Sequence, residues 1–144
     1  MTWSFGTRVA LLLAGATIAC SASAQTQARA TPAAEPLRFA RGASSASVTA
    51  RLKGPKSDLH DYVVRVKAGQ VLRVDLVTMS TSTYFRVMPP AGNDEPLFRG
   101  EMEPHPHWSG VVRVGGDYRV RVLLDRPRAR EGRDATYTLT VTLQ

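Results

Sequence analysis

Four arginines lie within the ten-residue segment Asp125–Asp134, near the C-terminal end of the chain: Arg126, Arg128, Arg130 and Arg133. A guanidinium group can donate two parallel hydrogen bonds to a carboxylate or a phosphate, so a loop of this composition could enter an acidic cleft. Three acids are interspersed among the arginines, and charge runs are commonly solvated surfaces. The segment is therefore a candidate site for an anionic partner, with a solvated hairpin connection as the alternative.

A second group with chemical potential is the pair His105 and His107, which share one face of an extended chain because they are two residues apart. With a nearby glutamate, such a pair could begin a zinc site. Pro106 stands between them, and the third histidine, His60, is distant in the sequence. We therefore expect a polar loop here and predict no metal site.

An acid–base pair could be sought in the segment Asp58–Asp61, where His60 lies beside two aspartates. No serine elbow or pair of carboxylates accompanies it, so the segment is better interpreted as a polar turn leading into a strand at Tyr62. The one cysteine, Cys20, lies in the N-terminal segment, which excludes thiol catalysis and cysteine-based metal sites in the rest of the chain. We expect no enzyme activity and no cofactor, and we expect Trp108 to anchor the core or its rim.

The N-terminus has the pattern of a secretory signal peptide over residues 1–24. Arg8 is followed by the short apolar run Val9–Ala19 and by an A-x-A cleavage pattern that ends at Ala24. The run is shorter than the about 20 apolar residues that span a bilayer. A lipid anchor at Cys20 is an alternative, but Thr17 is a poor substitute for the leucine usual before such a cysteine. The expected product is a free, monomeric protein of the periplasm.

The elements that would position these residues are short strands. Residues 25–36 are rich in Ala, Thr, Gln and Pro and indicate a flexible linker, and residues 37–144 form the expected domain. Alternating apolar residues indicate strands near 48–53, 62–67, 71–77, 83–88, 97–98, 108–114, 117–124 and 135–143. No segment has the length, periodicity and caps of a helix of ten or more residues. The prediction is an all-β fold, an antiparallel, jelly-roll-like β-sandwich of about eight strands.

Two connections can be proposed from the turn residues. Gly115-Gly116 is able to adopt the positive φ angles of a primed turn and predicts a hairpin between strands 108–114 and 117–124. The arginine segment would then join 117–124 to the last strand as a second hairpin. In that last strand the apolar residues point one way and four threonines point the other, which is typical of a strand with one face in water.

Six segments of the chain form a recognisable set: Leu37–Ala46, Asp61–Val63, Lys67–Gln70, Thr83–Pro90, Gly116–Val122 and Ala135–Leu139. Together they resemble the bacterial periplasmic inhibitors of g-type lysozyme, within the broader pre-peptidase C-terminal-like β-sandwich domains. The resemblance spans Leu37 to Leu143 without a large insertion. The segments Phe39–Ala46 and Tyr84–Pro90 are the narrower signals, whereas the turn that ends at Gln70 and the final segment Tyr137–Val141 also occur in the broader group and support the fold.

This resemblance implies a β-sandwich that blocks a muramidase by placing loops in its substrate cleft, where a catalytic glutamate lies. Two arginines four apart recur in the family's loop and align with Arg126 and Arg130, between which lies Arg128. Tyr84 would contribute a second contact or belong to the core. The loop departs from the family pattern at Pro127, Arg128, Glu131 and Gly132.

The net charge of +7 and the pI of about 10.3 fit any anionic partner in the cell envelope. The leading hypothesis is an inhibitor whose partner is g-type lysozyme. The alternative is a non-enzymatic module that binds anionic glycans or lipopolysaccharide. Nucleic acid is not expected, because acids are interspersed in the arginine segment and the chain carries an export signal.

Overall fold

The computed structural model describes residues 33–90 and 95–144. The predicted signal peptide, the lipid-anchor alternative at Cys20 and most of the predicted linker lie outside these residues. Within the described part, no helix is long and apolar enough to cross a membrane.

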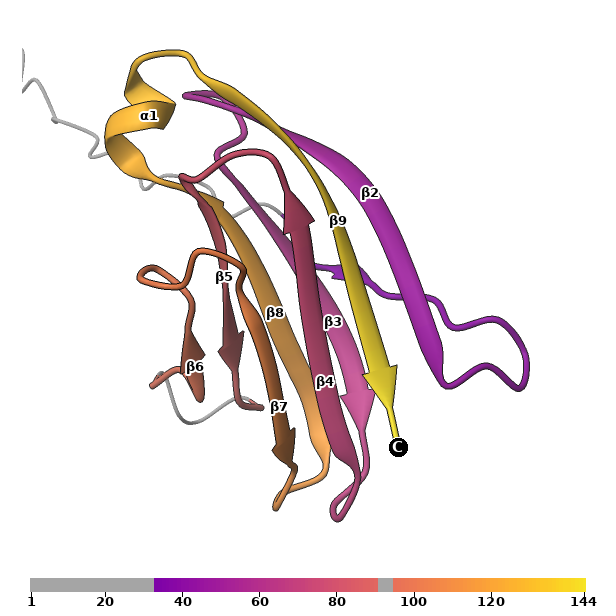
Figure 1. Cartoon of the computed structure of the whole chain (residues 1–144). Helices are drawn as coiled ribbons and strands as arrows, with labels where there is room; N and C mark the ends of the chain where they lie inside the picture. The colour runs from indigo at the N-terminus through magenta and orange to yellow at the C-terminus, as the bar shows by residue number, and fades with distance from the viewer. Residues whose placement is uncertain (1–32, 91–94) are drawn as a thin grey trace, which may run out of the picture. The chain divides into compact units, whose positions relative to one another are not determined.

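Nine strands form two sheets, which confirms the all-β sandwich (Figure 1). The first sheet has the order β1 (Glu35–Pro36), β3 (Leu59–Val66), β8 (Gly116–Leu124), β5 (Thr83–Met88) and β6 (Phe98–Arg99). The second sheet has the order β2 (Ser45–Lys53), β9 (Asp134–Leu143), β4 (Val71–Thr78) and β7 (His107–Val111). One short helix, α1 (Arg126–Arg130), connects β8 to β9.

The core fills the space between the two sheets with residues from alternate positions of each strand. From β4 come Leu72, Val74 and Leu76, as their period of two predicts, and from β8 come Val120 and Val122. Trp108 is partly buried and packs against this cluster, which confirms it as a rim anchor. Because both inner faces are apolar, their burial supplies the main stabilisation of a domain that has no disulfide among its described residues.

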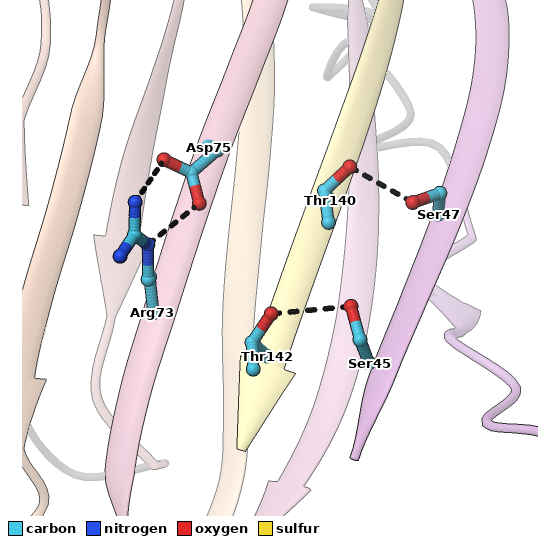
Figure 2. Close-up of polar contacts among 6 residues, drawn as sticks. All are labelled: Ser45, Ser47, Arg73, Asp75, Thr140 and Thr142. Carbon is cyan, nitrogen blue, oxygen red and sulfur yellow. Dashed lines mark hydrogen bonds and ion pairs between the residues drawn. The ribbon is translucent and has the colours of Figure 1, made fainter. Parts of the chain in front are cut away.

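The outer face of the second sheet is covered with hydroxyl groups. Its β2 and β9 side chains are hydrogen-bonded across the strands, and Figure 2 shows two of these contacts, Ser45 with Thr142 at 3.1 Å and Ser47 with Thr140 at 2.8 Å. On the neighbouring β4, Arg73 donates a hydrogen bond to Asp75 on the same face. The predicted orientation of the threonines toward water is confirmed.

Four details differ from the sequence-based expectations. Strands β7 and β8 do not form a hairpin, because β7 pairs with β4 in the second sheet while β8 pairs with β3 and β5 in the first. Strands β8 and β9 also lie in different sheets, so the arginine segment is a crossover. Glu35 and Pro36, expected in a flexible linker, pair with β3, and in parallel. Strand β3 begins at Leu59 instead of Tyr62.

Candidate functional site

The arginine segment contains one helical turn rather than an open loop. Pro127 stands at the start of α1, where its fixed φ suits a helix and its missing N–H is not needed. The turn closes with hydrogen bonds from the N–H of Ala129 to the carbonyl of Asp125 (2.9 Å) and from Gly132 to Ala129 (3.1 Å). Gly132 has a φ of 73°, the left-handed conformation that ends many helices. At five residues, α1 is too short to show helical periodicity in the sequence.

Helix α1 is braced by the turn between β2 and β3. Ala129 is its buried residue, and the backbone of Ala129 lies so close to Gly54 that a Cβ on Gly54 would be 2.4 Å from the Cα of Ala129. The N–H of Gly54 also donates to the carbonyl of Arg133 (3.2 Å). On the other side, the N–H of Asp125 donates to the carbonyl of Ser82 (2.8 Å). The arginines are therefore carried by backbone that is fixed on two sides.

The four arginines differ in their ion pairing. Arg128 and Arg133 both approach the carboxylate of Glu131, at 3.2 Å and 3.8 Å. Arg126 and Arg130 are exposed, and neither has an ion-pair partner among the residues that the structure describes. Glu131 therefore neutralises part of the charge of Arg128 and Arg133, whereas Arg126 and Arg130 are available to bind another molecule.

Tyr84 lies on the outer face of β5, half-buried, and is not part of the core, whereas its neighbour Phe85 is fully buried. The Arg86 guanidinium lies over the Tyr84 ring, 5.8 Å from the centroid, and is paired with Glu101. Burial raises the pKa of the Tyr84 phenol, and the charges of Arg86 and Arg126 act in the opposite direction. Tyr84 lies close enough to Arg126 for the charge of Arg126 to affect the Tyr84 phenol. The two residues are close because β5 pairs with the end of β8 that leads into α1.

A groove of about 740 Å³ lies on the other side of α1. Its walls are the β4–β5 connection, including Met79, and the segment from α1 into β9, including Arg128 and Arg133. Three of the residues predicted for partner binding, Arg126, Arg128 and Arg130, belong to α1, and Arg128 lines the groove. The fourth, Tyr84, belongs to β5, which pairs with the strand that leads into α1. Met79 and the groove itself were not found from the sequence, because no local pattern brings the two connections together.

A polar network of hydrogen-bonded side chains lies between the two sheets, where β3 faces β9. The Tyr137 hydroxyl is hydrogen-bonded to Nδ1 of His60 (2.7 Å) and to the Tyr62 hydroxyl (2.6 Å), and Nε2 of His60 contacts the Ser57 hydroxyl (3.2 Å). Burial lowers the pKa of His60 and raises the pKa of Tyr62 and of Tyr137. The network links β3, which carries His60 and Tyr62, to β9, which carries Tyr137, and so joins the two sheets.

The aspartate beside His60 has a different partner. Asp61 is 1% exposed and accepts two hydrogen bonds from Arg121, at 2.7 Å and 2.8 Å. This contact raises the pKa of Arg121. The His60 ring and the Asp61 carboxylate therefore belong to separate contacts and do not form an acid–base pair.

The two histidines considered for metal binding are both exposed, and His107 begins β7. The carbonyl of Pro106 between them accepts a hydrogen bond from the N–H of Leu76 (3.1 Å), which extends the pairing of β7 with β4. Within residues 33–90 and 95–144, no group of three or more His, Cys, Asp or Glu side chains is arranged to hold a metal ion.

No protein-family model and no curated protein sequence matches the chain. Among solved structures, the chain is similar to Aeromonas hydrophila PliG, a periplasmic inhibitor of g-type lysozyme, with a TM-score of 0.67 and 29% identity over 77% of this chain and 96% of that one. Salmonella Typhimurium PliG shares the fold at TM-score 0.58 and 20% identity, over 76% of this chain and 96% of that one.

The broader group is represented by the pre-peptidase C-terminal domain of a Bacillus anthracis collagenase, with a TM-score of 0.50 and 11% identity over 77% of this chain and 96% of that domain. This likeness concerns the fold alone. In fold and in sequence, the chain is therefore similar to the bacterial periplasmic inhibitors of g-type lysozyme, as its motifs predicted.

Proposed function

We propose that this protein is a periplasmic inhibitor of g-type lysozyme and not an enzyme, and that it blocks the muramidase cleft by inserting the segment around α1. One observation carries the mechanism: Arg126 and Arg130 are exposed guanidinium groups without an ion-pair partner among the described residues, on a helical turn fixed by backbone contacts. The similarity to the Aeromonas inhibitor, which covers nearly all of that chain, supports the choice of target.

The inhibition follows from the chemistry of carboxylates. Glycoside hydrolysis needs a carboxylic acid that protonates the leaving oxygen. A guanidinium placed against that group favours its ionised form and lowers its pKa, so the proton is no longer available. The same contact fills the space that the substrate's sugar ring requires.

The remaining predicted residues flank these two arginines. Tyr84 lies beside the start of α1 and offers a half-exposed ring, which can cover apolar surface and donate one hydrogen bond. Arg128 extends the positive charge toward the groove. We propose that Tyr84 and Arg128 widen the contact, with Arg126 and Arg130 at its centre.

The test is a muramidase assay in which the protein without residues 1–24 is titrated against a g-type lysozyme, with c-type and i-type enzymes as controls. We expect inhibition of the g-type enzyme alone. Each of Arg126→Ala and Arg130→Ala should weaken it more than tenfold, since truncating one partner of a buried charge pair at an interface costs about 2–5 kcal/mol. Arg65→Ala is a matched control, because Arg65 is exposed and pairs with Asp117 at the far end of the first sheet.

The outcomes separate the mechanism from the function. Normal inhibition by both arginine variants would reject the arginine mechanism. Failure of the unmodified protein to inhibit any g-type enzyme would reject the function. In that case, binding to lipopolysaccharide or anionic glycans that falls steeply with salt would favour the envelope-binding alternative.

A further inference from the structure

The groove beside α1 has an exposed apolar edge. One wall carries Val77, at the end of β4, which is 69% exposed, and Met79, in the β4–β5 connection, which is fully exposed. Methionine has an unbranched, flexible side chain that adapts to many partner surfaces. This apolar edge is bordered by the polar residues Ser80, Thr81 and Ser82, and an apolar side chain of a partner could bury it.

The opposite wall of the groove is positively charged. Arg128 and Arg133 both line it, and they share one carboxylate, Glu131, through exposed contacts that another anion can replace. The one acid in the lining, Asp134, already accepts a hydrogen bond from Arg51 at 2.7 Å. The groove therefore combines an apolar edge with a cationic wall and suits a segment that carries an apolar side chain beside a carboxylate.

The groove and the surface proposed for the lysozyme lie on two sides of the same helix, since Arg128 lines the groove and Arg126 and Arg130 do not. Helix α1 carries Arg128 on the groove side, between the two arginines proposed to enter the cleft. A protein partner seated on Arg126 and Arg130 would also reach the groove, because an ordinary interface covers about 800 Å² of each partner and α1 is only five residues long. The occupant is thus expected to come from the same molecule.

We infer that this groove is a second docking surface for the lysozyme, which receives an acidic segment outside the catalytic cleft with an apolar side chain against Met79. The inference rests on the proposed function and extends it, since neither Met79 nor Arg133 has a role in blocking the cleft. The second surface would let the inhibitor distinguish between lysozymes whose catalytic residues are alike.

The test measures the Kd for a g-type lysozyme by calorimetry, with the full-length chain expressed with its own N-terminal segment and purified from the periplasm. Met79→Glu places a like charge against the acidic segment and should raise the Kd at least tenfold, roughly the effect of losing a central contact. Met79→Ser removes only the apolar side chain and should raise it by a smaller factor, as should Arg133→Ala. Met102→Glu is the matched control, because Met102 is 91% exposed and outside the groove.

Folding of each variant is checked by thermal unfolding, and no change in Tm is expected for Met79→Glu because the side chain makes no buried contact. The inference is overturned if Met79→Glu and Arg133→Ala bind as the unmodified protein does, or if Met102→Glu weakens binding equally. It is distinct from failure of the proposed function, in which the unmodified protein itself would not bind and Arg126→Ala would change nothing.

Discussion

Because the backbone of α1 packs directly against Gly54, a substitution at Gly54 should displace the arginines of α1 without changing any of them. In Gly54→Ala, the added methyl group would be 2.4 Å from Cα, 2.5 Å from O and 2.8 Å from C of Ala129. These are backbone atoms, so no side chain can rotate away. Ordinary van der Waals contact begins near 3.4 Å, and α1 must therefore shift by about 1 Å or the β2–β3 turn must yield. Overpacking of this kind costs about 1–3 kcal/mol.

Two measurements are needed for Gly54→Ala: the free energy of unfolding in urea and the inhibition constant against a g-type lysozyme. We expect the free energy to fall by about 1–3 kcal/mol and inhibition to weaken by roughly tenfold or more, because misplacement by about 1 Å can cost up to 100-fold at a preorganised site.

Gly69→Ala is the control for stability alone. Gly69 has a φ of 88°, lies in the turn after β3 at the opposite end of the first sheet, and has free space around it. The substitution should cost about 1–2 kcal/mol through backbone strain and leave inhibition unchanged. If Gly54→Ala inhibits as well as the unmodified protein, the position of α1 does not control inhibition and the reasoning is refuted.

Three further predictions concern the interior of the domain. Tyr137→Phe leaves the Tyr62 hydroxyl and His60 Nδ1 without their shared partner and should lower the free energy of unfolding by about 1–3 kcal/mol. As the pH falls from 7 to 5, the free energy of unfolding should decrease, because burial lowers the pKa of His60 and the unfolded chain therefore takes up the proton more readily than the folded chain. Thr83→Val should raise the free energy of unfolding by about 1 kcal/mol, since the buried Thr83 hydroxyl has no hydrogen-bond partner among the described residues.

Urea unfolding monitored by circular dichroism measures all three. A Tyr137→Phe protein as stable as the original would show that the hydroxyl network contributes nothing. The pH dependence should be weaker in His60→Gln, and an unchanged dependence would assign it to other groups. A loss of stability in Thr83→Val would mean that the Thr83 hydroxyl is satisfied in solution.

The strands were predictable because burial of one face leaves a trace in the sequence. The sequence predicts Thr83–Met88 with the bounds that the structure has, since the buried residues Phe85 and Val87 alternate with partly buried positions and two prolines follow. Alternation reports which face of a strand is buried but not which strand lies beside it. For this reason the sequence predicts a hairpin turn at Gly115-Gly116, whereas in the structure this turn connects the two sheets.

The candidate site was predictable in composition and not in geometry. Arg126 and Arg130 were singled out by spacing and resemblance, but the preference of Glu131 for Arg128 and Arg133 depends on the fold of the turn. The contact of Gly54 with Ala129 joins positions far apart in the sequence, and so does the His60–Tyr137 hydrogen bond. Long-range contacts of this kind leave no local periodicity.

The crossover of β8 into β9 through α1 has a consequence for the kinetics of binding. Because the two ends of the segment belong to different sheets, we expect the backbone that carries the arginines to change little when a partner binds. Association then loses little conformational entropy in the backbone, and its rate should be governed by electrostatic attraction that decreases with ionic strength. The heat-capacity change on binding should correspond to the apolar area buried at the interface, without the larger change that accompanies folding of a disordered segment.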